Sequence, residues 1–451
     1  MCSMHIIIIG AGEVGFHIAK FLSGESAGVV VVDQDKNKLR RITDELDVAV
    51  LEGEGGSPTL LKEAGADKAD MMIAVTNSDE TNMIACMIGK ALFNIPRKIA
   101  RLRNQEYLNN KVILDRDNLD INPAISPELE VADVVIRLIE IPYAAEVEDF
   151  EDGLIKVIGF RVYSDSPLKD KSLKKIRKTL SKPFLIGAVL RMPDVIIPTG
   201  DTVLRENDIV YVPVRKEDLA DTLSILGADH RPAKSIMIVG GGRIGFSVAK
   251  KMEAQSGRTV KIIDRGEDRC RFLSNQLSSS IILNGDGSDQ NLLEEENIAD
   301  MDAFLALSNN EELNIMSSLL AKKLGVKKVV TLVNRTDYVD LVSSLGIDSV
   351  LSPRLITAST ILRYIRHGDI KSLTAIADNK AEIIEAAINS SSPLCRKTLA
   401  KAKLPRHSLI GAIIRGNSTC IPTGQDVIED GDRLIFFGTT SAIRSLGKFL
   451  T

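Results

Sequence analysis

The sequence predicts an α/β protein in which two doubly wound parallel-sheet domains alternate with two small α+β domains. The first observation behind this prediction is a strand–turn–helix–strand unit at residues 5–33. The second is the return of that unit about 230 residues later, and the third is a shorter repeated segment after each large unit. Strands that alternate with helices of about ten residues favour a right-handed, mostly parallel sheet.

The unit at residues 5–33 has each part of a Rossmann-type nucleotide-binding motif. The isoleucine run at 6–9 indicates a strand buried on both faces, and the turn 10–15 (Gly-Ala-Gly-Glu-Val-Gly) leads into a helix ending near Leu22. A second apolar strand ends at Asp33. In this motif the glycines allow a tight turn and the close approach of a pyrophosphate, and the acid accepts hydrogen bonds from ribose hydroxyls. The pattern therefore predicts a nucleotide site at this turn.

Three further strands in the first half place polar residues at one edge of the predicted sheet. The strands are expected at 48–51, 71–75 and 98–103, and the helices at 36–45, from 59, and at 82–92. Ligands of such sheets bind at the carboxyl ends of the strands. Besides the glycine turn and Asp33, the residues that fall at this edge are Glu54, Thr76, Asn77 and Arg101.

The second half repeats this pattern in register. A strand at 236–239 enters a Gly-Gly-Gly-Arg-Ile-Gly turn at 240–245, and the next strand ends at Asp264. The later turns and strands of the first half also have counterparts, at 285–289, 306–312 and 330–335. Six matching elements in the same order indicate an internal duplication.

The segments that follow the large units match each other too. Residues 185–191 resemble 409–415, and Ile-Pro-Thr-Gly occurs at both 197–200 and 421–424. Short strands, turns and one or two helices favour a small α+β domain, an amphipathic helix precedes each one, and the polar stretch 228–233 is the expected linker between the halves. The predicted segments are 1–123 (large domain), 124–145 (helix), 146–228 (small domain), 234–352 (large domain), 353–372 (helix) and 373–451 (small domain).

Composition narrows the function. The chain has 451 residues, a net charge of −4 and no clustered basic face, so nucleic acid is not an expected partner. No apolar run approaches the roughly 18 residues of a membrane span, and the first strand follows Met4 directly, so neither a membrane span nor a signal peptide is expected. Five scattered cysteines without a CxxC pair favour reduced thiols in a cytoplasm, and the scattered histidines suggest no metal site.

Catalysis is not expected, because the residues that hydride transfer or ATP hydrolysis requires do not cluster. The small segments lack a group of His, Lys or Tyr to exchange a proton near a nicotinamide, and the chain has no GKS/T phosphate loop. Two alternatives remain open at this point. One is an NAD-dependent oxidoreductase with duplicated Rossmann domains, and the other is a nucleotide sensor whose partner is not a channel.

The duplicated layout resembles the TrkA family of bacterial Trk potassium-uptake systems, in which two RCK (KTN) units are each followed by an RCK C-terminal domain. The resemblance covers essentially the whole chain. Besides both glycine turns, it rests on Ala-Val-Thr-Asn-Ser-Asp-Glu-Thr-Asn-Met at 74–83, Ile-Ala-Arg-Leu-Arg at 99–103, Asn334-Arg335 with Tyr338 and Leu341, and both Ile-Pro-Thr-Gly segments.

The resemblance implies a cytoplasmic regulatory subunit, peripheral on the inner face of the cell membrane, that acts on an integral-membrane potassium transporter. It further implies a homo-oligomeric ring, a dimer or a tetramer of chains, whose gating responds to bound NAD(H) or ATP/ADP. The helices within 124–145 and 353–372 would then be crossover elements that pair neighbouring units.

The family pattern also assigns site residues in each half. In the first half Thr76 and Asn77 would form the rim near the adenosine and phosphates, with helix capping as their alternative role, and Arg101 would face a phosphate. Arg103, which is expected on the same strand, is a weaker candidate. The residues carried over for the first site are Gly10, Ala11, Gly12, Glu13, Val14, Asp33, Thr76, Asn77 and Arg101.

The second site departs from the first in its charges. Arg243 lies within the glycine turn and Arg265 follows the ribose acid, so the two sites are expected to differ in preferred nucleotide or occupancy. Asp264 opposes an NADP preference, which keeps NAD or an adenine nucleotide ahead. The residues carried over are Gly240, Gly241, Gly242, Arg243, Ile244, Asp264, Ser308 and Asn309.

Overall fold

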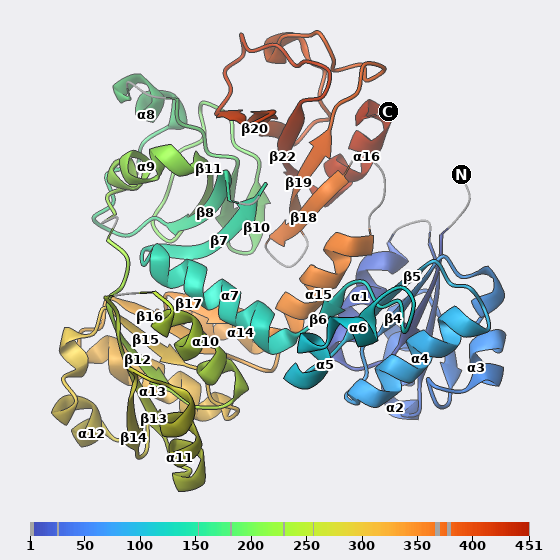
Figure 1. Cartoon of the computed structure of the whole chain (residues 1–451). Coiled ribbons are helices and arrows are strands. Elements are labelled where there is room, and N and C mark those ends of the chain that lie inside the picture. The colour runs from blue at the N-terminus through green and yellow to red at the C-terminus, as the bar shows by residue number, and fades with distance from the viewer. Residues whose placement is uncertain are drawn as a thin grey trace. The chain divides into compact units, whose positions relative to one another are not determined.

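The computed structural model of the chain confirms the predicted fold class, with two parallel sheets alternating with two small antiparallel sheets along the chain (Figure 1). The structure describes residues 4–24, 27–151, 153–180, 183–228, 231–255, 257–365, 370–376 and 380–450. Residues 229 and 230 of the expected linker lie outside these ranges, as do 366–369 of the second predicted helical segment.

The first large domain is a six-stranded sheet with the strand order β3-β2-β1-β4-β5-β6. Its strands are β1 (His5–Ile9), β2 (Gly28–Asp33), β3 (Ala49–Glu52), β4 (Met71–Ala74), β5 (Arg97–Arg101) and β6 (Ala124–Ile125). Its helices are α1 (Glu13–Ser23), α2 (Lys36–Glu45), α3 (Pro58–Glu63), α4 (Asp79–Ala91), α5 (Gln105–Asn109) and α6 (Lys111–Leu114). The order reverses between β1 and β4, which creates the crevice where doubly wound folds bind ligands.

Strand β1 forms the centre of this domain because its residues are apolar on both faces. The four isoleucines at 6–9 are at most 1% exposed, and β1 pairs in parallel with β2 on one side and β4 on the other. Two predicted boundaries in this domain are wrong by more than one residue. Strand β5 ends at Arg101, so Arg103 follows the strand, and α4 begins at Asp79 because the side chain of Ser78 caps it.

The second large domain repeats this topology, with the strand order β14-β13-β12-β15-β16-β17. Its strands are β12 (Ser235–Val239), β13 (Thr259–Asp264), β14 (Ile281–Asn284), β15 (Ala303–Ala306), β16 (Lys328–Leu332) and β17 (Ser349–Leu351). Its helices are α10 (Arg243–Glu253), α11 (Glu267–Gln276), α12 (Gln290–Glu295), α13 (Glu311–Lys323) and α14 (Tyr338–Ser344).

Each small domain is a five-stranded antiparallel sheet with one or two helices. The first contains β7 (Ala144–Phe150), β8 (Ile155–Arg161), α8 (Leu173–Thr179), β9 (Ala188–Arg191), β10 (Asp194–Ile196), β11 (Ile209–Arg215) and α9 (Leu219–Leu226). The second contains β18 (Ile370–Ile376), β19 (Ala381–Ala387), β20 (Ser408–Arg415), β21 (Ser418–Cys420), β22 (Arg433–Thr439) and α16 (Thr440–Leu450). One hydrophobic cluster includes buried residues of both sheets, among them Phe150, Tyr211, Ile383 and Phe437.

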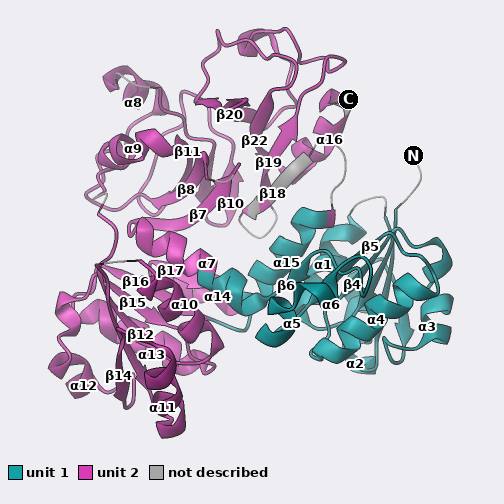
Figure 2. Ribbon diagram, in the orientation of Figure 1, with its two compact units in different colours: residues 1–132, 333–337, 351–364 teal, residues 133–332, 338–350, 365–451 magenta. Residues whose placement is uncertain are grey.

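Two amphipathic helices connect the large and small domains, namely α7 (Pro127–Glu140) and α15 (Pro353–Ile365). The chain divides into two compact units, and residues 333–337 and 351–364 group with the first 132 residues (Figure 2). Most of α15 therefore belongs to the unit that contains the first large domain. Within the described residues, no helix combines the length and the apolar character that crossing a membrane requires.

Candidate nucleotide-binding site

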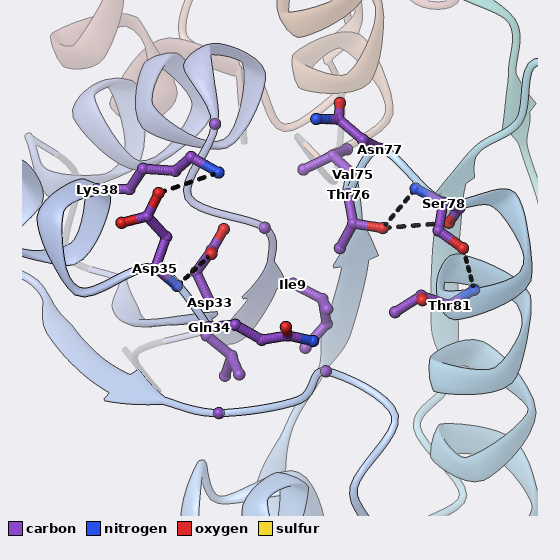
Figure 3. A pocket seen from close by; sticks show the side chains of 15 residues that line it. Ile9, Asp33, Gln34, Asp35, Lys38, Val75, Thr76, Asn77, Ser78 and Thr81 are labelled. Carbon is purple, nitrogen blue, oxygen red and sulfur yellow. Dashed lines mark hydrogen bonds and ion pairs between the residues drawn. The ribbon is translucent and has the colours of Figure 1, made fainter.

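A cavity of about 390 Å³ lies at the carboxyl ends of the first parallel sheet. Figure 3 shows Asp33, Gln34, Asp35 and Lys38 on one side of it and Thr76, Asn77 and Ser78 on the other. Of the predicted site residues, it is lined by Gly10, Gly12, Asp33, Thr76 and Asn77. Ala11, Glu13, Val14 and Arg101 do not line it, and neither does Glu54, although its neighbours Gly53 and Gly55 do.

The glycine turn has the shape that a phosphate-binding turn requires. Gly10 has a φ of 111°, a conformation that side chains disfavour, and a Cβ on Gly15 would lie 1.9 Å from the carbonyl oxygen of Gly10. A Cβ on Gly12, by contrast, would meet nothing within 4 Å. Gly12 is the residue before α1, so the open space beside it adjoins the N-terminus of that helix, where anions are favoured.

The acid at the end of β2 holds the turn in place. Asp33 accepts hydrogen bonds from the backbone N–H of Ala11 through Oδ2, at 2.6 Å, and from the backbone N–H of Asp35 through Oδ1, at 2.9 Å. Each carboxylate oxygen can accept a second hydrogen bond. The carboxylate therefore has a fixed orientation at the cavity and further capacity to accept the two hydroxyls of a ribose.

Glu13 and Val14 have other contacts. Glu13, the first residue of α1, accepts a hydrogen bond from Arg41 of α2 at 2.6 Å, and the Arg41 guanidinium lies 4.0 Å from the centre of the Phe16 ring. Val14 is buried in the core. These two predicted site residues thus support α1, and the negative charge of Glu13 is offset by Arg41.

Asn82 organises the opposite wall of the cavity. Its Oδ1 accepts hydrogen bonds from the N–H of Thr76 at 2.9 Å and from the Thr76 hydroxyl at 2.7 Å, and its Nδ2 donates to the carbonyl oxygen of Arg101 at 2.8 Å. Asn82 is fully buried. The residue that caps α4 is Ser78, whose hydroxyl accepts from the N–H of Thr81, so the capping role weighed for Thr76 and Asn77 falls to their neighbour.

Arg101 lies directly behind this wall. One guanidinium nitrogen donates to the Thr76 carbonyl at 3.1 Å and to Asn77 Oδ1 at 3.2 Å, and the residue is only 8% exposed. Burial, followed by the charge of Arg103, lowers the pKa of Arg101 to about 10, so the guanidinium is still a cation at neutral pH. Arg101 therefore does not line the cavity itself but is hydrogen-bonded to Asn77, which does.

The second large domain reproduces these contacts. Asp264 accepts from the N–H of Gly241 at 2.7 Å, and Asn314 accepts from the hydroxyl of Ser308 at 2.7 Å and donates to the carbonyl of Leu332 at 3.0 Å. Gly240 has a φ of 101°, a positive value like that of its counterpart Gly10. Arg243 and Ile244 are the first two residues of α10, and Asn309 precedes the residue that caps α13.

Cations distinguish this second set of residues. Arg265 pairs with Asp286 at 2.6 Å, which lowers the pKa of Asp286 to about 2, assisted by the backbone N–H of Ser288. Arg269 donates to the carbonyl oxygens of Gly241 and Gly242 in the glycine turn. Arg265 is the position that differs in charge, because the first half has Gln34 there, whereas Glu54 and Lys38 keep the charges of Asp286 and Arg269.

Asn82 and Asn314 are the residues that the sequence analysis missed as parts of the site. Each stands six positions after the rim residue that it holds, Thr76 or Ser308. The sequence did contain a signal for both residues, because asparagine occupies the matched position in each half. The described residues contain no group of three His, Cys, Asp or Glu side chains placed to hold a metal ion.

Comparison with known proteins identifies relatives over the full length. The TrkA-N domain family matches residues 6–127 and 236–353, and the TrkA-C domain family matches 157–227 and 383–451. The Trk system potassium uptake protein TrkA of Halomonas elongata is 40% identical over 438 residues, which cover 96% of this chain and 95% of that protein. TrkA homolog 2 of Methanosarcina mazei is 37% identical over 451 residues, 99% of each protein.

Solved structures share the fold at lower sequence identity. The crystal structure of the GsuK RCK domain aligns with a TM-score of 0.61 at 20% identity and covers 99% of this chain and 95% of that chain. The GsuK channel bound to NAD aligns with a TM-score of 0.60 at 20% identity, covering 99% of this chain and 79% of that one. At such identities the similarity establishes the fold and leaves the function to be argued from the site.

Proposed function

This chain belongs to the TrkA family of Trk system potassium uptake proteins, and from that premise we propose that it is the nucleotide-binding regulatory subunit of such a system. In this proposal it binds NAD(H) or ATP/ADP and controls potassium flux through an integral-membrane transporter. It resides in the cytoplasm, peripheral on the inner face of the cell membrane, and assembles into a homo-oligomeric ring.

The observation that carries the proposal is the fixed carboxylate of Asp33 beside an open glycine turn. A pyrophosphate would lie against Gly10 and Gly12 at the N-terminus of α1, because the first N–H groups of a helix have no partner within the helix. The ribose hydroxyls would donate to Asp33, and Asn77 would contact the phosphates with the charge of Arg101 behind it. The matched contacts of Asp264 and Gly241 support a second site.

Regulation follows if the nucleotide binds two arrangements of neighbouring units with different affinity. A ligand shifts a conformational equilibrium only by its differential affinity for the two states. The helices α7 and α15, as crossover elements between the predicted domains, would pass that bias to the ring, and the ring would act on the transporter. Relatives named for potassium uptake support the choice of partner.

Calorimetric titration of the full chain with NADH, NAD, ATP and ADP tests nucleotide binding. Gly12→Asp and Gly242→Asp serve as site-specific variants, because neither glycine has an atom within 4 Å of an added Cβ and both have ordinary φ values. Each carboxylate would repel phosphate from its own site. Each variant should therefore lose the binding of one site only. Absence of binding of all four ligands to the wild type would reject the proposal.

A second experiment separates regulation from catalysis. The chain would be combined with its transporter in vesicles, and potassium flux would be measured with and without nucleotide for the wild type and Gly12→Asp. The proposal expects a nucleotide-dependent flux that the variant loses. Oxidation of NADH with a carbonyl substrate, without any effect on flux, would instead favour an oxidoreductase.

A further inference from the structure

We infer that the first small domain binds the anionic lipid surface of the membrane through exposed lysines on and beside α8, and that the second small domain carries a matching set. The lysines of the first set, called the α8 patch below, are Lys171, Lys174, Lys175 and Lys178. This inference rests on the proposed position of the chain at the inner face of the membrane, and it names the component of the membrane that the chain contacts directly.

Helix α8 turns its lysines toward solvent because its apolar residue packs inward. Ile176 is 4% exposed, whereas the four lysines of the α8 patch are exposed. Lys178 lies four positions after Lys174 and three after Lys175, so these side chains are neighbours on one face of the helix. Figure 1 shows α8 at the outer edge of the first small domain. The lysines therefore form one exposed basic surface of this domain.

The charges of the α8 patch are not neutralised within the part of the chain that the structure describes. None of its four lysines forms an ion pair there. The two neighbouring cations already have partners, because Lys169 pairs with Glu206 at 2.8 Å and Arg177 donates to the carbonyl oxygen of Phe184 at 2.9 Å. Asp170 is the only acid between residues 169 and 180. Unpaired like charges repel one another, and an anionic surface would offset that repulsion.

The overall composition does not reveal this cluster. The net charge of the chain is −4, because acids elsewhere outnumber the cations. The expectation that the chain has no clustered basic face is therefore wrong at α8.

The second small domain repeats the cluster around the 3-10 helix η4 (Leu399–Lys401). Ser172 and Thr398 occupy equivalent positions, since each forms an antiparallel bridge just before its helix. Counting from that pair, lysines recur at two matched positions, 171 with 397 and 175 with 401. No acid occurs between residues 396 and 407. The exposed cations around η4 are Arg396, Lys397, Lys401, Lys403 and Arg406.

The composition of both clusters favours a lipid surface over a protein or a nucleic acid. The cores of protein interfaces are depleted in lysine and depend on aromatic anchors, and proteins that bind single-stranded nucleic acid stack the bases on aromatic rings. Neither segment, 169–180 or 396–407, contains Phe, Tyr or Trp. An anionic membrane needs no matching shape, because each lysine near its surface adds its own attraction. Clusters of four or more cations on a helix are typical of such binding.

The test is co-sedimentation of the full chain with vesicles that lack the transporter. One set is phosphatidylcholine alone, and the other also contains anionic phosphatidylglycerol. The wild type should sediment only with the anionic vesicles, and added salt should release it. Replacing all four lysines of the α8 patch by glutamine should weaken this binding by at least about tenfold. Adding Lys397→Gln, Lys401→Gln and Lys403→Gln should weaken it further.

A control variant removes the same charge from the large domains and should bind as the wild type does. Its four exposed lysines, each changed to glutamine, are Lys20, Lys62, Lys68 and Lys323. All variants should unfold at the wild-type temperature and bind nucleotide as before, because the substituted side chains lie on the surface and outside the nucleotide cavity.

Three outcomes would overturn the inference. Wild type that does not sediment with anionic vesicles at low salt would exclude lipid binding, and an equal loss in the patch and control variants would assign the binding to net charge. Loss of the patch variant from neutral vesicles that contain the transporter, without wild-type binding to lipid alone, would assign the lysines to an acidic surface of the transporter. Failure of the wild type to bind any nucleotide is a different result, since it rejects the proposed function itself.

Discussion

The carboxylate of Asp33 accepts a hydrogen bond of 2.6 Å from the backbone N–H of Ala11, which ties the end of β2 to the glycine turn after β1. Asp264 accepts from Gly241 in the same way, at 2.7 Å. An acid expected only to receive ribose hydroxyls therefore also shapes the turn that faces the phosphates. Its removal should affect both functions.

Asp33→Ala is expected to weaken nucleotide binding at the first site by at least about tenfold, because both the ribose acceptor and the anchor of the turn are lost. The nucleotide affinity of Asp33→Asn, which keeps an acceptor oxygen, should lie between those of Asp33→Ala and the wild type. Calorimetry with NADH and ATP measures the effect, and Asp44→Ala, an exposed acid on α2, is the control. If Asp33→Ala bound both ligands as tightly as the wild type, the first site would be misassigned.

Substitution by alanine should destabilise the protein at one glycine of the turn and have little effect at another. Gly15→Ala places a Cβ 1.9 Å from the Gly10 carbonyl oxygen, so we expect a loss of about 2 kcal/mol or more in the free energy of unfolding. Gly12→Ala meets no atom within 4 Å and should unfold near the wild-type temperature. Thermal unfolding followed by circular dichroism compares them. Equal unfolding temperatures would contradict the close packing of α1 on the turn.

Asn82→Ala should cost about 1–3 kcal/mol of stability and weaken nucleotide binding to the first site. The substitution leaves the N–H of Thr76 and the carbonyl of Arg101 without their partner in a buried place. Urea unfolding and calorimetry measure the two effects. Asn314→Ala is the matched variant, and it should weaken the second site alone; loss of first-site binding in Asn314→Ala would contradict the independence of the two walls.

The sequence predicts the strands and turns that carry these sites more readily than the side-chain contacts within them. Apolar runs such as residues 6–9 and the repeated glycine turns predict the strands and their order, because those features depend on neighbouring residues. Asn82 was not predicted as a site residue, since its hydrogen bonds to Thr76 and Arg101 form only when the folded sheet brings these residues together. Arg103 was wrongly expected on strand β5, which ends two residues earlier at Arg101. The backbone N–H of Arg103 donates to the Asp79 carboxylate.

Lys328 should make stability depend on pH in the alkaline range. The side chain is fully buried and donates to Ser349 and to the carbonyl of Ala144; burial lowers the pKa of Lys328 from its ordinary value of 10.5 to about 8. Between these two values the unfolded chain binds more protons than the folded chain, so the free energy of unfolding rises with pH. Below about pH 8 both states are protonated and the contribution is constant.

The measurement compares urea unfolding of the wild type and Lys328→Met from pH 7 to pH 10. The stability of the wild type relative to the variant should rise by at most about 1.4 kcal/mol per pH unit above pH 8. Only this slope is diagnostic, because the variant also loses two hydrogen bonds. Parallel pH profiles of the two proteins would show that Lys328 does not titrate in this range.

Phe437 should be a principal stabilising residue of both small domains. It belongs to the cluster shared by the two antiparallel sheets, and a Cβ on Gly411 or on Gly187 would lie 2.3 or 2.5 Å from its ring. Phe437→Ala is expected to cost about 3–5 kcal/mol, and Gly411→Ala about 1–3 kcal/mol through overpacking. Thermal unfolding measures both. Gly447→Ala, which meets no atom within 4 Å, is the control, and an equal effect of both glycine variants would argue against the packing.

The shared cluster also bears on how a duplicated gene simplifies assembly. A polypeptide cut near residue 228 would keep the first small sheet but expose Phe150 and Tyr211 without Ile383 and Phe437 to cover them. Such a half-length chain would have to find a second molecule, and its stability would fall on dilution. In the full chain the covering sheet is covalently attached, so its local concentration is set by the connecting residues rather than by expression level. The duplication thus converts an encounter between two molecules into a step of folding.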